Sequence, residues 1–458
     1  MADHNFDVVI LGGGSGGYAA ALRSAQLGKS VALIEKDKLG GTCLHRGCIP
    51  TKALLHSAEV ADSVKDAAHY GVNATFGSID MPAVNQYRDS IVDRLFKGLT
   101  GLVGSKNITV VQGEGRLAGP KTVQVGGDYY NGQNLVLASG SYSRSLPGLE
   151  IGGRVITSEH ALQLNFVPNK VIVLGGGVIG VEFASIWRSF GAEVTIVEGL
   201  PNLVPNEDPA VSKALERAFR KRGIDFKTGV RFSGVQQHEN GVVVSLETGE
   251  TLEAELMLVA VGRGPNTAGL GYEEQGITMD RGYVLTNERL QTNIPGVYAA
   301  GDIVPGLQLA HRGFQQGIFI AEEIAGLKPA VIDENGIPKV TYCEPEIASV
   351  GLTEAKAKEQ YGADNVSTYE YNLGGNGKSQ ILGTAGFIKL VRKNNGPVLG
   401  VHMIGSRVGE QIGEAQLIVN WEAYPEDVAT LIHAHPTMNE AIGEAHLALA
   451  GKPLHAHA

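Results

Sequence analysis

The sequence predicts an α/β protein in which two similar strand–turn–helix units precede a C-terminal region of α+β character. Two observations lead to this prediction: the same glycine-rich pattern occurs twice, and the apolar periodicity changes from about Val340 onwards. The chain has 458 residues, too many for one ordinary core. Its 62 glycines indicate many tight turns and close backbone approaches.

The first unit begins with a short apolar strand at Phe6–Leu11, of the kind that is buried in a parallel sheet. A loop with Gly12, Gly14 and Gly17 follows, then an alanine-rich helix and a second strand, Ser30–Glu35. The glycines allow a tight turn and close approach to a pyrophosphate, while the helix N-terminus attracts phosphates. The glutamate that ends the second strand suits ribose hydroxyls, so the unit predicts a nucleotide site.

The second unit repeats this order, with a strand at Lys170–Leu174, glycines at Gly175, Gly177 and Gly180, and a strand at Glu193–Glu198. Two such units imply either two nucleotides or one working site and a decayed duplicate. All key glycines are kept in both copies, which favours two sites. An acid at Glu198 favours the free 2′-hydroxyl of NAD, because a 2′-phosphate would call for arginine there.

Bulk composition limits the classes of partner. There are 38 basic and 48 acidic residues, a net charge of −10, which argues against nucleic acid or an anionic membrane. No apolar run reaches the roughly 18 residues of a membrane span, and the N-terminus lacks the regions of a signal peptide. With three cysteines, a disulfide scaffold is not expected. We therefore expect a cytoplasmic enzyme.

The segments between and after the two units carry turns of small residues. Asn134–Ser141 is expected to be a buried strand that ends in such a turn, and the chain crosses between domains near Pro147 and again near Pro265. A further strand enters a turn at Gly301–Asp302, where the acid either holds a polyol chain or caps a helix.

The C-terminal region alternates apolar and polar residues, as antiparallel strands do, and Asn395-Gly396 is typical of a hairpin turn. Glu410–Trp421 has the pattern of an amphipathic helix. The last residues, His455–Ala458, are expected to be a frayed tail. This region has no nucleotide motif, so a separate domain that dimerises is a suitable interpretation.

Cys43 and Cys48 are separated by four residues, and Pro-Thr-Lys follows the second cysteine. The residues alone leave three interpretations: a redox-active disulfide, half of a metal site, or an inert core pair. A metal site would need a second pair of ligands that the sequence does not offer, so we expect no metal. Cys343 is interpreted as a small core residue.

A second dense segment is His433-Ala-His435-Pro-Thr-Met-Asn-Glu440. An imidazole oriented by a carboxylate is the usual general base. The alternative is a helix start with surface histidines, and for a lone His-x-His that alternative is preferable.

Taken together, the two glycine loops, the stretch Gly40–Lys52, the Gly301-Asp302 turn and His433–Glu440 resemble, in order, a class I pyridine nucleotide-disulfide oxidoreductase of the two-cysteine, FAD-containing type. The resemblance extends over essentially the whole chain. It implies two Rossmann-like nucleotide-binding domains, one for FAD and an inserted one for NAD, and a C-terminal α+β dimerisation domain. The implied ranges are 1–148 and 266–338 for the FAD-binding and central parts, 149–265 for NAD, and 339–458 for the interface.

The resemblance also implies roles for individual residues. Cys43 exchanges with substrate and Cys48 faces the flavin, while His435, oriented by Glu440, acts as base across the interface of an obligate homodimer. Lys52 and Glu182 form an ion pair near the reactive flavin nitrogen. The implied FAD-binding residues are Gly12, Gly14, Gly17, Glu35, Lys36, Gly41, Thr42, Lys52, Gly115, Ser139, Gly140, Ser141, Asp302, Gln308, Leu309, Ala310 and His311. The implied NAD-binding residues are Gly175, Gly177, Val178, Ile179, Gly180, Glu182, Glu198, Val230 and Gly262.

The branch of the family that fits best oxidises protein-bound dihydrolipoamide through the disulfide and FAD, with hydride transfer to NAD. The implied partners are lipoyl domains of 2-oxo acid dehydrogenase complexes or the lipoyl protein of glycine cleavage. An NADPH-linked reductase of a small disulfide is the main alternative, and a non-catalytic interaction subunit is another. The sequence departs from the usual pattern at His45-Arg46, Ser139 and Gln308, and His45-Arg46 is expected to change the thiolate pKa or the potential.

Overall fold

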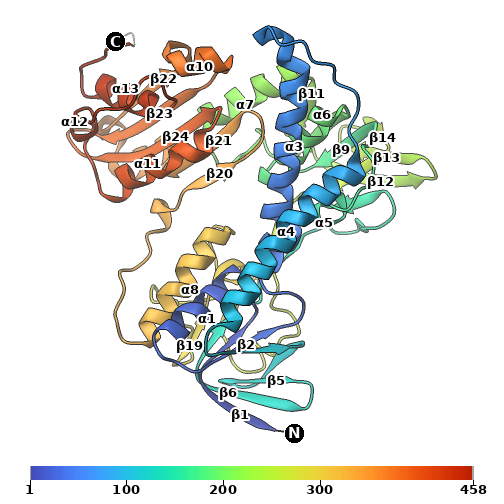
Figure 1. Cartoon of the computed structure of the whole chain (residues 1–458), viewed down its shortest axis with the longest axis vertical. Coiled ribbons are helices and arrows are strands. Elements are labelled where there is room, and N and C mark those ends of the chain that lie inside the picture. The colour runs from blue at the N-terminus through green and yellow to red at the C-terminus, as the bar shows by residue number, and fades with distance from the viewer. Residues whose placement is uncertain (1, 456–458) are drawn as a thin grey trace.

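The computed structural model describes residues 2–455, which form an elongated molecule with three main sheets (Figure 1). The predicted tail residues 456–458 lie outside the described part, but His455 is held by the carboxylate of Glu444. None of the helices in residues 2–455 combines the length and apolar character that a bilayer crossing requires.

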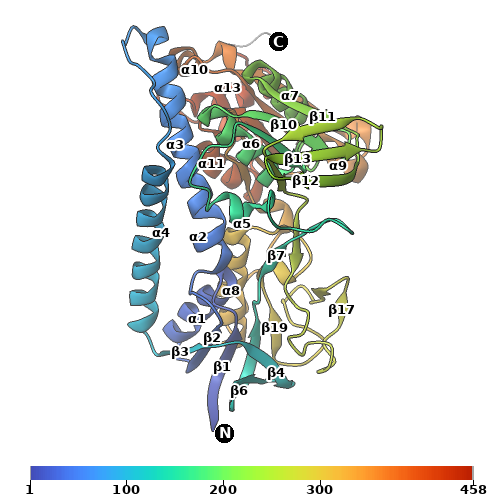
Figure 2. The same cartoon turned by 90° about the vertical axis from the view of Figure 1, so that its right-hand side faces the viewer.

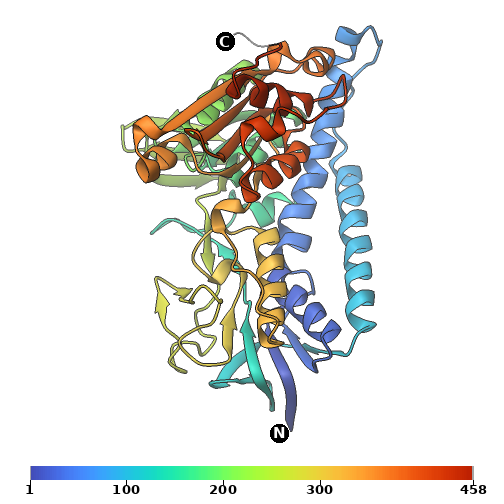
Figure 3. The same ribbon diagram turned by 90° about the vertical axis from the view of Figure 1, so that its left-hand side faces the viewer.

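The first sheet has the order β3-β2-β1-β6-β5-β4, with β19 added beside β6. β1 lies at its centre, with parallel β2 on one side and parallel β6 on the other. Helices α1 (Ser15–Gln26) and α8 (Ala310–Ile324) pack side by side against this sheet (Figures 1 and 3). The strands are β1 (Asp3–Leu11), β2 (Val31–Glu35), β3 (Ile108–Gln112), β4 (Gly115–Gly119), β5 (Thr122–Val125), β6 (Asp128–Leu137) and β19 (Val297–Ala299).

The first strand starts earlier than the predicted Phe6. Asp3 to Phe6 are paired with Tyr129 to Gly132 of the long β6, so backbone hydrogen bonds extend the strand beyond its apolar part. The added residues Asp3, His4 and Asn5 are polar and are exposed or half-buried, so they lack the apolar signal that the prediction used.

The second sheet is wholly parallel, in the order β11-β10-β9-β15-β8. Both of its faces are buried, which explains the nearly continuous apolar runs of β9 and β15. Helices α6 (Val178–Phe190) and α7 (Pro209–Arg222) are its crossover helices. The strands are β8 (Val155–Thr157), β9 (Lys170–Leu174), β10 (Glu193–Glu198), β11 (Ile224–Thr228) and β15 (Leu256–Val259), and a small antiparallel sheet of β12 (Phe232–His238), β13 (Gly241–Leu246) and β14 (Thr251–Ala254) lies beside them.

The two predicted domain crossings, near Pro147 and near Pro265, lie in or next to strands that pair with each other. β7 (Ser141–Ser143) and β16 (Arg263–Pro265) pair with each other as antiparallel strands, between the first and second sheets. The chain therefore leaves and re-enters the first sheet through one shared two-stranded connection.

The third sheet is antiparallel, in the order β20-β21-β24-β23-β22, and carries α11 (Val408–Asn420) and α13 (Glu440–Leu449) on one face. Along β23 and β24, Ile388 and Met403 face these helices, whereas Phe387 and Ile404 face the second sheet's core. This alternation is the period of two that the sequence predicted. Its strands are β20 (Lys339–Thr341), β21 (Glu346–Gly351), β22 (Val366–Asn372), β23 (Phe387–Lys393) and β24 (Val398–Gly405).

Two long helices, which we did not predict, lie between the first and the second nucleotide unit in the sequence. α3 (Cys48–Asp66) and α4 (Met81–Gly104) run beside each other along the long axis of the molecule (Figure 2). Leu54 and Ala58 of α3 belong to the core that also contains α6. α3 thus connects the cysteines to the second nucleotide unit.

A buried ion cluster ties the second unit to the third sheet. Asp208, the N-cap of α7, is fully buried and accepts a hydrogen bond of 2.9 Å from Lys389 of β23. Lys389 also donates to Glu354 at 2.7 Å, at the start of α9 (Glu354–Tyr361). Burial alone would raise the pKa of Asp208, but the hydrogen bonds from Lys389 and the Ala210 N–H lower it overall.

We expect Asp208→Asn to destabilise the fold by about 3 kcal/mol, because it leaves Lys389 buried with a single carboxylate partner. Thermal unfolding monitored by circular dichroism measures the effect, with the exposed Asp225→Asn of β11 as control. Since the folded pKa of Asp208 is lowered, its contribution is complete at neutral pH and is lost as the pH falls through the folded pKa. The difference between the two variants should therefore shrink in acid, and equal melting temperatures at neutral pH would contradict the role of the cluster.

Candidate active site

The two cysteines lie at the junction of two helices. α2 (Gly41–Arg46) carries Cys43, Gly47 interrupts the helix, and α3 begins at Cys48. The cysteines are joined by a disulfide, with their Cα atoms 4.6 Å apart. The disulfide interpretation of the sequence is therefore confirmed. Residues 2–455 contain no group of three or more His, Cys, Asp or Glu side chains arranged to hold a metal ion.

The cysteine segment is fastened to the first glycine loop. The N–H of Gly40 donates to the carbonyl of Gly13 at 2.9 Å. A Cβ atom on Gly41 would lie 2.8 Å from the Cα of Gly14, and Gly41 has a positive φ of 59°. Only glycine permits this contact without displacement. The disulfide is therefore held next to whatever the first loop binds.

His45 and Arg46 anchor the outer side of this segment. The ring of His45 is hydrogen-bonded to the Leu39 carbonyl at 2.9 Å and meets Phe96 of α4 edge-on. Arg46 pairs with Asp37 at 3.0 Å in a half-exposed position. Their side chains thus fix the local backbone, and their predicted effect on thiol chemistry stays a prediction.

Lys52 and Glu182 come from different units and meet one turn beyond Cys48. The Lys52 ammonium lies 2.8 and 2.9 Å from the two carboxylate oxygens of Glu182. Glu182 is buried and also accepts the N–H of Tyr342 at 2.9 Å, while Lys52 lies 4.9 Å from the centre of the Tyr342 ring. Sequence analysis missed Tyr342, because a backbone donor carries no residue-type signal.

A cavity of about 60 Å³ adjoins the first glycine loop. Five of the predicted FAD-binding residues line it, namely Gly12, Glu35, Lys36, Gly115 and Ser139. Asn266 and Leu270, which we did not predict, also line it. They come from the segment that returns after the second unit, and no motif marks them.

Both glycine loops are built in the same way. Glu35 accepts the N–H groups of Gly13 and Asp37 at 2.7 and 2.8 Å, and Glu198 accepts those of Gly176 and Leu200 at 2.6 and 2.8 Å. Each carboxylate oxygen keeps a second lone pair for a ribose hydroxyl. The N–H of Val230 donates to the carbonyl of Glu198 at 3.1 Å, which places this predicted residue beside the second acid.

The third glycine of each loop allows helix and strand to touch. A Cβ on Gly17 would lie 1.8 Å from the Gly12 carbonyl oxygen, and one on Gly180 would lie 1.9 Å from that of Gly175. α1 and α6 therefore start directly over the loops, after Gly14 and Gly177, with no side-chain cap on their first N–H groups. Free N–H donors with an adjacent carboxylate fit the pyrophosphate and ribose of a dinucleotide, so both loops fit FAD or NAD.

Asp302 of the Gly301–Asp302 turn contacts Ser141, two residues beyond Ser139, which lines the cavity. Asp302 accepts the hydroxyl of Ser141, and Arg263 donates to the same hydroxyl at 2.7 Å. Gln308 donates to the Asp302 carbonyl at 3.4 Å, and His311 is hydrogen-bonded to the Pro338 carbonyl at 2.7 Å. Asp302 lies within a short 3₁₀ helix, Gly301–Ile303, so the helix N-cap alternative is wrong. Its carboxylate is oriented by Ser141 and Arg263.

His435 and Glu440 form the predicted pair, with 2.9 Å between Nδ1 and the carboxylate, and α13 begins at Glu440. Among residues 2–455 the His435 ring is hydrogen-bonded only to Glu440, and its side chain is 75% exposed. The helix that starts at Glu440, α13, and the helix that carries Cys43, α2, lie apart in Figure 2. A second pair, His433 with Glu414 at 2.7 Å, lies beside it, and that hydrogen bond raises the pKa of His433.

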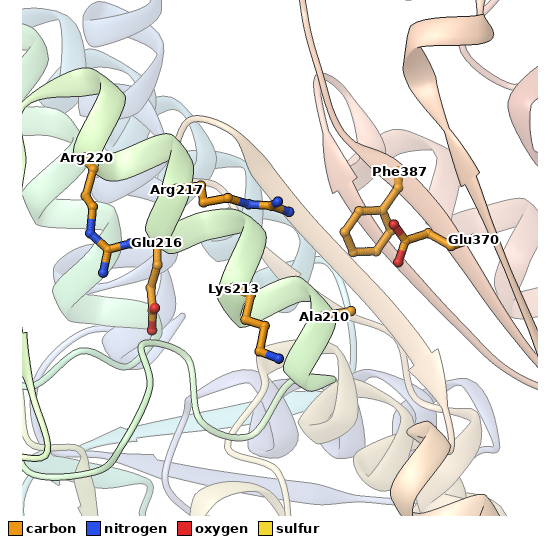
Figure 4. Close-up of a pocket in the computed structure, with 7 residues that line it drawn as sticks. All are labelled: Ala210, Lys213, Glu216, Arg217, Arg220, Glu370 and Phe387. Carbon is orange, nitrogen blue, oxygen red and sulfur yellow. The ribbon is translucent and has the colours of Figure 1, made fainter.

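A larger cavity of about 410 Å³ lies between α7 and strands β22 and β23 (Figure 4). None of the predicted site residues lines it. Its rim consists of long charged side chains, among them Lys213, Arg217 and Glu370. We interpret it as a solvated groove between the second unit and the third sheet.

Comparison with known families agrees with this geometry. Residues 6–317 match the family described as pyridine nucleotide-disulphide oxidoreductase, and residues 337–446 match the dimerisation domain of that family. The chain belongs to the pyridine nucleotide-disulphide oxidoreductases, as the sequence predicted. It is similar to a dihydrolipoyl dehydrogenase of Bacillus subtilis (strain 168), with 42% identity over 471 residues that cover 98% of this chain and 99% of the relative. It is also similar to the mitochondrial dihydrolipoyl dehydrogenase 2 of Arabidopsis thaliana, at 41% identity with 98% and 91% covered.

Solved structures have the same fold. LpdA from Mycobacterium tuberculosis superposes with a TM-score of 0.90 at 27% identity, over 97% of this chain and 99% of that chain. The Cu(II) complex of the HOCl-induced flavoprotein disulfide reductase RclA from Escherichia coli gives 0.88 at 27% identity, over 97% and 100%. The predicted α/β class with a C-terminal dimerisation domain is thus confirmed.

Proposed function

We propose that this chain is an FAD-containing, NAD-dependent dihydrolipoyl dehydrogenase, which oxidises protein-bound dihydrolipoamide to lipoamide. The observation that carries the proposal is the Cys43–Cys48 disulfide held against the first glycine loop. Relatives with this name are 42 and 41% identical over nearly the whole chain. FAD and NAD are the cofactors, with FAD assigned to the first loop and NAD to the second.

In the proposed cycle the dithiol of the substrate loses a proton to His435 and attacks the sulfur of Cys43. The resulting mixed disulfide is resolved by the second substrate thiol, which releases lipoamide and leaves Cys43 and Cys48 reduced. FAD, which the residues of the first glycine loop would hold, would supply an acceptor for the electron pair of the reduced cysteines and a hydride donor for NAD. The balance is dihydrolipoamide and NAD⁺ giving lipoamide, NADH and one proton.

The remaining residues bind and orient. Glu35 and Glu198 are proposed to accept ribose hydroxyls, and the free N–H groups of α1 and α6 to accept pyrophosphate oxygens. The ion pair of Lys52 with Glu182 is proposed to supply fixed charge beside the reacting part of the flavin, because the lysine lies one turn from Cys48. The other predicted FAD- and NAD-binding residues keep their assignments as part of this proposal.

The dimerisation domain supports a homodimer, and the exposed His435 supports a base that serves the partner subunit. Lipoyl domains of 2-oxo acid dehydrogenase complexes, or the glycine cleavage lipoyl protein, are the proposed partners. The proposed division is 1–148 with 266–338, 149–265 and 339–458, because each range supplies most of one main sheet. A cytoplasmic location is proposed from the lone redox pair in a chain with one other, buried cysteine.

We expect Cys43→Ser to keep bound flavin but to lose oxidation of dihydrolipoamide by about 10³-fold, because the sulfur that exchanges with substrate is gone. Flavin absorbance and NADH formation measure the two properties. Ser63→Ala, at an exposed serine of α3 outside the pair, is the control and should keep its turnover. Undiminished turnover in Cys43→Ser would rule out the assignment.

We expect His435→Gln to lower dihydrolipoamide oxidation by about 10²-fold or more, because the substrate thiol loses its base. NADH oxidation by an artificial acceptor bypasses the thiols and should change little. His455→Gln removes another imidazole paired with a glutamate and is the matched control. Equal losses of His435→Gln in both assays would contradict the base role.

We expect Glu198→Ala to raise the KM for NAD about tenfold, because a charged hydrogen bond to a ribose hydroxyl is lost. Glu193→Ala, at the exposed start of the same strand, is the control. Steady-state kinetics with NAD and NADP measure the effect. A preference of the unmodified protein for NADP would favour the alternative, an NADPH-linked disulfide reductase.

A further inference from the structure

Arg222, the last residue of α7, makes an unusual number of contacts with other elements. Its guanidinium donates to the hydroxyls of Ser185 and Ser189 at 2.7 Å each, to the Glu344 carbonyl at 3.0 Å and to Asp62 at 3.1 Å. These acceptors lie on α6, on α3 and on the loop between β20 and β21 of the third sheet. One side chain therefore joins α7 to three other parts of the fold.

The side chains that accept hydrogen bonds from Arg222 lie on the same two helices as Glu182 and its partner Lys52. Ser185 and Ser189 follow Glu182 on α6 at helical spacing, so the three side chains share one face. On α3, Asp62 lies further along the helix that carries Lys52. Because Lys52 binds Glu182, and Asp62 accepts the Ser189 hydroxyl, α3 and α6 are linked at two levels.

The same face of α6 also holds the segment of residues 342–344. The N–H of Tyr342 donates to Glu182 at 2.9 Å, and the N–H of Glu344 donates to the Ser185 hydroxyl at 3.0 Å. Arg222 completes this link by donating to the Glu344 carbonyl. The backbone donor that holds the Glu182 carboxylate is therefore fixed two residues away by Arg222 and Ser185.

The side chains that Arg222 contacts on α6 are buried, so losing its hydrogen bonds should be costly. Ser185, Ser189 and Glu182 are each at most 3% exposed. The Arg222 side chain is 19% exposed, and its charge opposes the burial that raises the pKa of Glu344 to about 7. Removing the guanidinium would take away the donor to the Ser189 hydroxyl and to the Glu344 carbonyl, and residues 342–344 or α6 would have to shift to satisfy them.

We propose that Arg222 is a positioning residue for the redox reaction, which acts by holding α6 and residues 342–344 so that Glu182 stays bonded to Lys52. This inference rests on the proposed function, which supplies the reaction whose rate is measured. Arg222 touches neither cysteine, and its influence passes through Glu182. Replacing it should therefore lower kcat although Arg222 itself touches no reacting group.

The test is a double-mutant cycle on the holoenzyme. Arg222→Gln should lower kcat for NAD-linked dihydrolipoamide oxidation about tenfold, and by less than about twofold in a Glu182→Gln background, because coupled residues of one network are not additive. Arg217→Gln, an exposed arginine on the same helix, is the control and should keep wild-type kcat. An equal loss in both backgrounds, or no loss in the first, would overturn the proposal.

A second readout does not depend on activity. Amide hydrogen exchange should be faster in α3 and in residues 342–344 of Arg222→Gln than in Arg217→Gln. If Arg222→Gln does not fold, Ser185→Ala removes the shared hydroxyl and keeps every charge, and it should give a smaller, likewise non-additive loss of kcat. Unchanged exchange in both segments would also overturn the proposal. A wild-type enzyme without dihydrolipoamide activity, but with the exchange difference, would instead refute the proposed substrate alone.

Discussion

The contact between Gly41 and Gly14 determines where the chemistry takes place. A side chain on Gly41 would collide with the first glycine loop, and the Gly40 N–H to Gly13 hydrogen bond closes the same contact. The two backbones therefore meet directly at this point. Because Gly41 starts the helix of Cys43, this contact holds the disulfide beside the first glycine loop, which we propose binds the pyrophosphate of FAD.

Helix α3 links the cysteines to more distant parts of the fold. Cys48 starts the helix, Lys52 follows one turn later, and Asp62 lies near its end. Each meets a different partner: Cys43 of α2, Glu182 of α6, and Arg222 of α7. The second nucleotide unit is thereby held to the cysteines by polar pairs on one helix, and the apolar contacts of Leu54 and Ala58 fill the space between them.

The parts predicted from sequence are those whose signal is local. Glycine spacing marks both loops, since only glycine tolerates the approach of Gly17 to Gly12 and of Gly180 to Gly175. The pairs Lys52–Glu182 and His435–Glu440 were inferred from family resemblance, because their members lie far apart in sequence or lack a periodic pattern. Tyr342, Arg222 and Asn266 act through backbone atoms or tertiary contacts, so no pattern marks them. α3 and α4 were missed because only limited faces of these long helices are buried.

The exposed face around His435 gives a physical reason for the dimer. Ile432 is fully exposed, Trp421 is 75% exposed and Leu431 is 59% exposed, all within the domain that matches the dimerisation family. Large exposed apolar side chains are costly in water, so we expect that another chain covers them. His435 is hydrogen-bonded to Glu440, and its side chain is 75% exposed. We propose that a second copy covers these apolar residues and that His435 serves the disulfide of the partner subunit, so that association would complete the site as well as bury the surface.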